Sequence, residues 1–102
     1  MRIIKIPSVR RFWNKHSDAK PGLEHWLRIA KAAEWQSLGD TRLTFSHADE
    51  VKVASGNTVT VFNVAGRKYR LVVAIKYRWG IVYIRDFMTH AEYNKDRWKA
   101  RH

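Results

Sequence analysis

The sequence contains no cysteine, which excludes disulfide bonds, thiolate metal sites and cysteine nucleophiles. It also lacks any apolar run approaching the roughly 20 residues that a membrane-spanning helix requires. The first residues mix charges with apolar side chains and offer no cleavage site of small residues, so no signal peptide is expected. These absences favour a cytoplasmic protein with no membrane partner.

Acidic residues are scarce as well. The 102 residues include 20 Lys and Arg against nine Asp and Glu, which gives a formal net charge of +11. Much of the excess lies in residues 65–102, which hold ten basic and three acidic side chains. A chain this basic attracts polyanions and releases their counterions on binding, which indicates a nucleic acid or ribosomal partner. The alternative is a charged surface that serves only solubility.

The chain does contain repeating apolar residues, first at the spacing of a helix and later at the every-second-residue spacing of a strand. Residues 1–6 are expected to form a short strand that ends at Pro7. A helix N-capped by Ser8 should follow, and a second helix should run from Pro21 to about residue 35. Residues 36–50 show neither period and are expected to be an extended connection.

The following part of the chain is rich in β-branched and aromatic residues and is expected to form strands. Three runs, 58–64, 68–79 and 81–87, are separated by short turns at 65–67 and at Gly80. Short turns between such runs predict an antiparallel meander.

The polar tail begins with a signal for a helix. Thr89 and Glu92 have the spacing of a capping box, so a short C-terminal helix or tail is expected there. The sequence therefore predicts one α+β domain over residues 1–102. Two N-terminal helices should pack on one face of an antiparallel sheet of about four strands.

The run 68–79 should present two different faces, because side chains alternate across a strand. The face expected against the helices carries Leu71, Val73, Ile75 and Tyr77. The opposite face carries Arg70, Val72, Ala74, Lys76 and Arg78, and it can be joined by Tyr83 and Arg85 of the returning strand. We favour a phosphate-binding surface over a merely solvated face, because basic side chains dominate it.

Two neighbouring segments carry a family resemblance. The first, VFNVAGRKYRLVVAIKY, contains an F-N-x-x-G turn followed by Y-R-L, with Arg70 in that motif. The second, GIVYIRDFMTHAEYNK, contains a Y-I-R strand and a T-H-x-E-Y motif at 89–93. With this order and spacing, residues 62–95 resemble the HigB toxins, a branch of the RelE superfamily of bacterial toxin–antitoxin endoribonucleases.

The sequence departs from the family pattern at two positions. The family turn more often reads Gly-Gly-Asn, whereas this chain has Ala65, Gly66 and Arg67. Aspartate commonly follows the tyrosine of the closing motif, and here Asn94 follows Tyr93. The first change adds a cation beside the expected RNA groove, and the second puts in doubt a role for a carboxylate there.

The resemblance implies a RelE-like fold and cleavage of mRNA in the ribosomal A site, by attack of a ribose 2′-OH on the adjacent phosphate, without metal or cofactor. Such a reaction needs a base, an acid and a cation for the extra phosphate charge. The expected catalytic residues are His90 as acid or base, Arg70 as cation, Tyr93 as stacking or proton-relay group and Lys95 as acid or phosphate clamp. The expected RNA-binding residues are Arg67, Lys68, Lys76, Arg78 and Arg85. The other histidines, at 16, 25, 47 and 102, have no evident partner.

The resemblance also implies a partner protein. A cognate helix-turn-helix antitoxin, similar to HigA, should bind and neutralise the chain, and operator DNA should be contacted only through that antitoxin. Two other interpretations stay open at this point. The protein could be a non-catalytic basic module that binds RNA or DNA, or an inactive relative that only binds an antitoxin.

Overall fold

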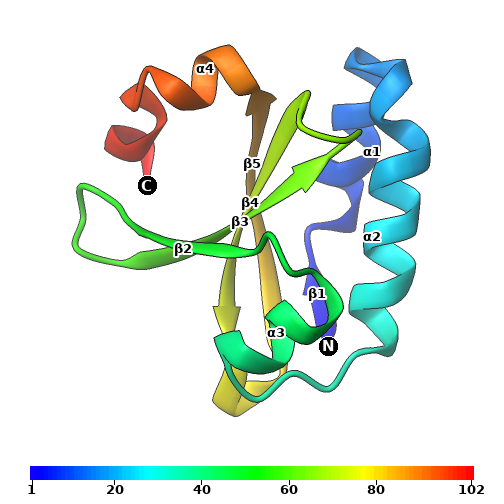
Figure 1. The fold of residues 1–102 in the computed structure, drawn as a ribbon, viewed down its shortest axis with the longest axis vertical. Helices are drawn as coiled ribbons and strands as arrows, with labels where there is room; N and C mark the ends of the chain where they lie inside the picture. Colours follow the sequence, from blue (N-terminus) through cyan, green and yellow to red (C-terminus); the bar gives the residue numbers. More distant parts are fainter.

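The computed structural model describes residues 1–102 as a five-stranded sheet with helices on one face and a C-terminal segment on the other (Figure 1). Four α-helices and three short 3-10 helices (η) alternate with the strands. In chain order the elements are β1 (Arg2–Ile4), α1 (Ile6–Lys15), η1 (Ser17–Ala19), α2 (Lys20–Ala32), α3 (Leu38–Thr44), β2 (Asp49–Lys52), β3 (Thr58–Val64), β4 (Tyr69–Lys76), η2 (Tyr77–Trp79), β5 (Ile81–Thr89), α4 (His90–Asn94) and η3 (Arg97–Arg101).

The strands lie in the order β1-β5-β4-β3-β2. Strands β3 to β5 form the antiparallel meander expected from the sequence. Strand β2 pairs antiparallel with β3 at one edge, and β1 pairs in parallel with β5 at the other. The predicted α+β class is therefore confirmed. The sheet has five strands rather than about four, because residues 49–52 form β2, which was not among the predicted strands.

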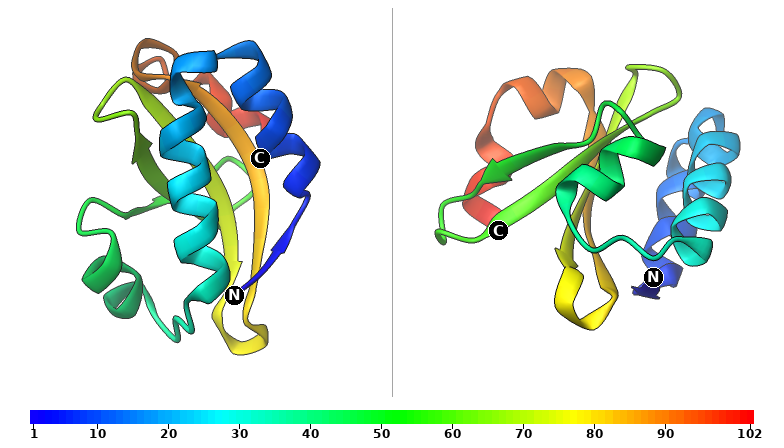
Figure 2. Two further views of the ribbon diagram at one scale, coloured as in Figure 1. Left: turned by 90° about the vertical axis from the view of Figure 1, so that its right-hand side faces the viewer. Right: turned by 60° about the horizontal axis from the view of Figure 1, so that its bottom comes forward.

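Helices α1 and α2 cover one face of the sheet, as Figures 1 and 2 show from three directions. Their apolar side chains, including Val9, Leu23 and Trp26, are buried in the larger core. The Trp26 ring meets Phe62 of β3 edge-on, with ring centroids 5.5 Å apart. The helix-facing side of β4 is the predicted one, because Leu71 and Val73 belong to the same core, with Ile75 and Tyr77 packed against it.

The start of α1 differs from the prediction. The helix begins at Ile6, with Pro7 in its first turn, where a missing N–H costs nothing. Lys5 occupies the N-cap position with a φ of 72°, and its side chain makes no capping hydrogen bond. Ser8 lies inside the first turn and accepts a hydrogen bond from Arg11 at 2.7 Å, so its prediction as N-cap is wrong.

Residues 36–50 are not an extended connection, because they contain the helix α3. Ser37 is its N-cap and accepts a hydrogen bond from the backbone N–H of Asp40 at 3.2 Å. The Asp40 carboxylate in turn accepts from the backbone N–H of Gln36 at 2.9 Å. The helix buries Thr41 but leaves Leu43 88% exposed, so its sequence carries a capping signal without an apolar stripe.

The opposite face of the sheet is not an open basic surface along its whole length. The segment from α4 to η3 crosses it, and Trp98 of η3 is only 1% exposed there. Trp98 packs with Val72 of β4 and Met88 of β5 in a second, smaller core. The Lys99 carbonyl accepts a hydrogen bond from the Ala54 N–H at 3.1 Å, which joins this segment to the β2–β3 loop. The predicted continuous basic face is therefore interrupted at its centre.

A β-bulge lies where the C-terminal segment crosses β5. Val72 pairs with Asp86 and Val73 with Ile84, so Arg85 is the extra residue on β5. The Asp86 carboxylate accepts hydrogen bonds from Arg101 and His102, each at 2.9 Å. These bonds bind the end of the chain to the sheet. None of the helices combines the length and apolar character that crossing a membrane demands.

Candidate functional site

The candidate site lies where β4 begins and β5 ends. Residues 65–68 turn the chain from β3 into β4, with Ala65 and Gly66 at φ values of 54° and 69°. The turn aligns Asn63 of β3 with Arg70 of β4, and Met88 of β5 lies on the other side of Arg70. Left-handed backbone conformations at consecutive positions produce such a tight reversal, which is why glycine is useful here.

Arg70 is the unusual residue of this region, because its side chain is charged and yet largely buried. The residue is 9% exposed. Its Nη1 donates hydrogen bonds to the carbonyls of Arg67 at 2.8 Å and Tyr69 at 3.1 Å. None of the ion pairs in the structure involves it. Buried charges are normally paired, so a restrained guanidinium without a carboxylate is suited to an anionic ligand.

Tyr93 of α4 provides an aromatic surface beside this guanidinium. The Arg70 Cζ lies 5.5 Å from the centre of the Tyr93 ring. The ring also stacks on Trp98, with centroids 5.3 Å apart and planes 20° apart. Burial raises the pKa of the Tyr93 phenol, and the negative charge of Asp49 raises it further. The hydroxyl therefore keeps its proton at neutral pH and can donate a hydrogen bond.

The helix α4 begins with the predicted capping box, which positions His90. The Thr89 side chain accepts from the N–H of Glu92 at 3.2 Å, and the Glu92 carboxylate accepts from the N–H of Thr89 at 3.1 Å. The His90 N–H donates to the Lys68 carbonyl at 3.0 Å, which joins the helix to the β3–β4 turn. The His90 imidazole is exposed and makes no hydrogen bond, so it is free to exchange protons with a ligand.

Lys95 follows α4 and lies beside a small cavity. The cavity has a volume of about 190 Å³ and is lined by Glu92, Lys95, Arg97, Trp98 and Arg101. Three of these side chains are cations and one is an acid, so the cavity is positively charged overall. Lys95 is exposed and forms no ion pair, as its predicted role as phosphate clamp requires.

His47 is a further candidate for the site that the sequence did not single out. It precedes β2, whose Asp49 pairs with Val61, so the chain at His47 runs toward Asn63, the partner of Arg70. Burial lowers the pKa of the His47 imidazole, and the positive charge of Arg70 lowers it further. A loop histidine has no periodic pattern around it, and only the pairing of distant strands brings it near Arg70.

The predicted RNA-binding residues are spread over four places. Arg67 belongs to the turn beside the site, and its carbonyl helps to restrain Arg70. Lys68 pairs with Asp18 of η1, on the side of the helices, and the Tyr69 hydroxyl donates to the same carboxylate at 2.7 Å. Arg85 is exposed in the bulge at the middle of β5.

Lys76 and Arg78 lie at the far end of β4. Lys76 is the sixth residue after Arg70 along the strand, which corresponds to a separation of about 20 Å. The structure therefore brings Arg70, Tyr93 and Arg67 together, with His90 and His47 nearby, and it separates them from Lys76 and Arg78. No group of three or more His, Asp or Glu side chains is arranged to hold a metal ion.

Comparison with known families places this geometry in context. The sequence matches the HigB toxin family, described as the RelE-like toxic component of a toxin–antitoxin system, over residues 19–96. This match spans most of the chain. The chain belongs to the HigB toxin family. No curated protein matches the sequence.

Family membership confirms the predicted resemblance to the HigB toxins and extends it well beyond the motif region. The match begins in η1 and ends after α4, so it includes Arg70, Tyr93, His90 and His47. A toxin of such a system acts together with an antitoxin, so this HigB toxin has an antitoxin partner. The interruption of the basic face by η3 lies outside the matched residues.

Proposed function

We propose that this HigB toxin is an endoribonuclease that inhibits translation by cleaving mRNA in the ribosomal A site. The observation that carries the proposal is Arg70, a buried and restrained guanidinium without an acidic partner, with a phenol beside it. A planar guanidinium can donate two parallel hydrogen bonds to phosphate oxygens. A charge already held in place needs no reorganisation when a phosphate becomes more negative.

In the proposed reaction the 2′-oxygen of a ribose attacks the adjacent phosphorus. A bond forms between that oxygen and phosphorus, and the bond from phosphorus to the 5′-oxygen of the next nucleotide breaks. A base takes the proton of the 2′-OH, and an acid gives a proton to the departing 5′-oxygen. The products are a 2′,3′-cyclic phosphate and a 5′-hydroxyl, and no metal or cofactor takes part.

His90 is the first candidate for the proton transfers, because its exposed imidazole has no competing hydrogen bond and an imidazole can act as base or acid. Arg70 stabilises the extra negative charge on the phosphate. Tyr93 supplies a proton-bearing hydroxyl or stacks on a base, and Lys95 serves as acid or phosphate clamp. Arg67, Lys68, Lys76, Arg78 and Arg85 contact the RNA backbone.

The shallow shape of the site supports a requirement for the ribosome. The nearest cavity, beside Lys95, has a volume of only about 190 Å³, and His90 lies on the surface. Such a site cannot hold a flexible RNA strand in a reactive geometry by itself. An mRNA held by the ribosome arrives already positioned, and positioning provides a large part of many rate enhancements.

The test is expression of the wild type, Arg70→Ala and His90→Ala, with mapping of mRNA 5′ ends and measurement of translation. The wild type should arrest translation and produce cuts in translated mRNA, and both variants should lose most of this effect. The matched control is Arg10→Ala, which removes an exposed cation on α1 and should stay fully toxic. Full toxicity of both site variants would refute the site assignment.

Cleavage and binding assays with the same purified proteins distinguish an enzyme from a binding module and from an inactive relative. Cleavage of mRNA on programmed ribosomes but not of free mRNA is the expected result. Tight RNA binding without cleavage in either setting would identify a non-catalytic binding module. Binding only to a helix-turn-helix antitoxin similar to HigA, with operator DNA contacted through that antitoxin, would identify an inactive relative.

A further inference from the structure

The tip of the β4–β5 hairpin exposes a tryptophan far from the candidate site. Trp79 of η2 is 68% exposed, whereas Trp26, Trp35 and Trp98 are at most 4% exposed. Only one other large apolar side chain, Leu43, is comparably exposed. Exposed tryptophan is unfavourable in water, so such a residue at the end of a hairpin suggests a binding function.

The tip is held firmly, so the exposure of Trp79 does not result from a loose loop. Gly80 adopts a φ of 66°, and its N–H donates to the Tyr77 carbonyl at 3.2 Å. The Arg2 N–H donates to the Gly80 carbonyl at 2.7 Å, which ties the tip to β1. The Tyr77 hydroxyl lies 3.0 Å from the Thr41 hydroxyl, which ties the tip to α3. The tryptophan is therefore presented in a fixed place, which reduces the entropy lost when a ligand binds.

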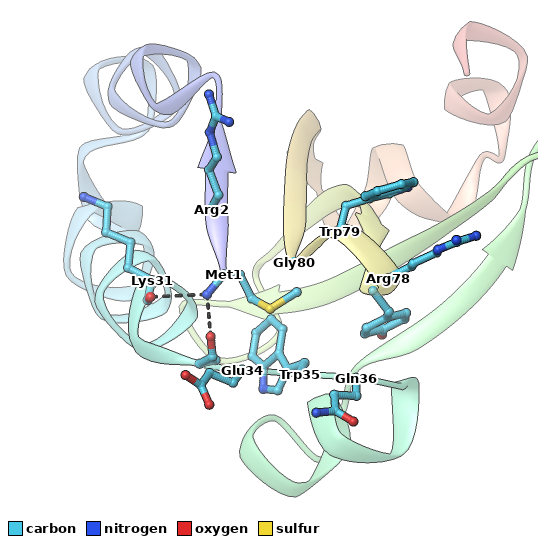
Figure 3. A pocket seen from close by; sticks show the side chains of 11 residues that line it. Met1, Arg2, Lys31, Glu34, Trp35, Gln36, Arg78, Trp79 and Gly80 are labelled. Carbon is cyan, nitrogen blue, oxygen red and sulfur yellow. Dashed lines mark hydrogen bonds between the residues drawn. The ribbon is translucent and has the colours of Figure 1, made fainter.

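An arginine lies over the tryptophan, and two further cations lie across a neighbouring cavity. The Arg78 Cζ lies 5.1 Å from the centre of the Trp79 ring. Both residues lie on one rim of a cavity of about 650 Å³, and Arg2 and Lys31 lie on the opposite rim (Figure 3). Glu34 is the one acidic residue in the lining. The exposed ring thus lies beside a concave surface that attracts anions.

We propose that the β4–β5 tip is a second RNA-binding surface, where Trp79 stacks on an unpaired base and Arg78 binds a flanking phosphate. Arg2 and Lys31, across the cavity, attract the strand by their charge. The Arg78 guanidinium covers one side of the indole, and a base stacks on the other. Alternation of an aromatic platform with cations is the arrangement that single-stranded RNA requires, because every nucleotide offers a flat ring and a negative charge.

The surroundings favour RNA over a protein partner. Arg78 lies over the Trp79 ring, Arg2 and Lys31 line the same cavity, and one acidic residue opposes these three cations, so the surface suits a polyanion. The chain as a whole carries a net charge of +11, so polyanions are attracted from a distance. The surface lies about 20 Å from Arg70 along β4, so it can bind RNA without the cleavage reaction. It shares Arg78 with the RNA contacts of the proposed function and adds Trp79 as a stacking surface.

The experiment measures binding of the full chain to a labelled single-stranded 12-nucleotide RNA, by fluorescence anisotropy without ribosomes. Trp79→Ala should raise the Kd about tenfold, because one stacked base is lost, while Trp79→Phe should keep most of the affinity. The matched control is Leu43→Ala, which removes the other exposed apolar side chain and should bind as the wild type. Thermal unfolding of each variant checks that the fold is intact.

A second readout follows the indole directly. Because three of the five tryptophans are almost fully buried, RNA stacked on Trp79 should quench intrinsic fluorescence in the wild type much more than in Trp79→Phe. Double-stranded RNA, whose bases are not free to stack, should be affected little by either substitution. Unchanged single-strand affinity of Trp79→Ala would overturn the proposal, and so would an equal loss for duplex RNA.

The design separates this proposal from the proposed cleavage. If Trp79→Ala instead binds RNA normally but loses affinity for the cognate antitoxin, the tip is a protein interface and the RNA proposal fails. Absence of cleavage by the wild type would end the proposed function and leave the RNA-binding result at the tip intact.

Discussion

The two ends of β4 each carry an arginine beside an aromatic ring, in opposite surroundings. At one end the Arg70 Cζ lies 5.5 Å from the Tyr93 ring, and Arg70 is 9% exposed. At the other end the Arg78 Cζ lies 5.1 Å from the Trp79 ring, and both residues are exposed. The pairs have nearly the same geometry. The difference in burial therefore decides what each pair can do.

Burial changes the strength of the charge and the freedom of the side chain. An interaction between charges is several times stronger near a low-dielectric interior than in water. Arg70 is also restrained by two backbone carbonyls, whereas the Arg78 side chain makes no hydrogen bond. The restrained charge suits a reaction in which negative charge develops at one point. The exposed pair suits reversible binding of an extended polyanion.

The largest expected effect comes from removing the buried charge and comparing it with the exposed one. Arg70→Ala should lower the rate of mRNA cleavage on programmed ribosomes roughly 100- to 1000-fold, because charge stabilisation at the phosphate is lost. Arg78→Ala should lower it only a few-fold, through weaker binding. Single-turnover cleavage of a defined mRNA measures both.

Arg70→Lys serves as the conservative control for that comparison. Lysine keeps the charge but cannot donate two parallel hydrogen bonds, so cleavage should stay well below that of the wild type. Thermal unfolding and antitoxin binding check that the variants are folded. Equal effects of Arg70→Ala and Arg78→Ala would mean that both arginines act only by attracting RNA.

A smaller effect should separate the two histidines near Arg70. His90→Gln should slow cleavage about 100-fold, at the low end of what a general acid or base contributes. His47→Gln should slow it about tenfold or less, since His47 is expected to help only to shape the site around Arg70. The measurement is the single-turnover rate as a function of pH.

The pH profile shows which imidazole takes part. Burial and the positive charge of Arg70 hold the pKa of the His47 imidazole below its ordinary value, so this side chain is neutral at physiological pH. If His47 were the essential base, the acid limb of the profile would lie below the ordinary range of an imidazole and would vanish in His47→Gln. We expect the acid limb of the wild-type profile to persist in His47→Gln and to vanish in His90→Gln.

A modest effect is expected at Tyr93, whose ring and hydroxyl can be tested separately. Tyr93→Phe keeps the stack on Trp98 but removes the hydroxyl, and it should slow cleavage about tenfold if one hydrogen bond is lost. Tyr93→Ala should also lower the melting temperature, because the stack is lost. Wild-type cleavage by Tyr93→Phe would limit the residue to stacking.

Local sequence signals predicted much of this fold. The apolar stripe of α2, the strands β3 to β5 and the capping box of Thr89 and Glu92 all follow from spacing within a few residues. The signal for α3 was of the same local kind, a Ser37 cap with Asp40 in the first turn. It was missed because the helix buries little more than Thr41 and so has no apolar period.

The site was less predictable because it depends on pairings between distant segments. The motif that contains Arg70 could be found in the sequence, but its burial and lack of an acidic partner could not. His47 approaches Arg70 only through the pairing of β2 with β3 and of β3 with β4. The covering of the central sheet by Trp98 depends on a polar tail whose single apolar anchor has no repeating pattern.

The smallest effect should come from Asp86, which lies between the two ends of the sheet and joins it to the C-terminal segment. Burial alone would raise the pKa of this carboxyl, but the hydrogen bonds from His102 and Arg101 outweigh it and hold the pKa below 3.8. A carboxyl with a depressed pKa stabilises the folded state above the unfolded value, and this stabilisation is lost as the pH falls through the folded value. Asp86→Asn should therefore cost about 1 to 2 kcal/mol of unfolding free energy at neutral pH. Urea denaturation should show the gap to the wild type closing as the pH drops below 3.8.

The matched control is Asp96→Asn, which removes an exposed partner of Lys99 and should change stability by less than about 0.5 kcal/mol. Cleavage by Asp86→Asn should stay close to wild type, and a gap in stability that persists in acid would show that packing, rather than charge, holds the segment.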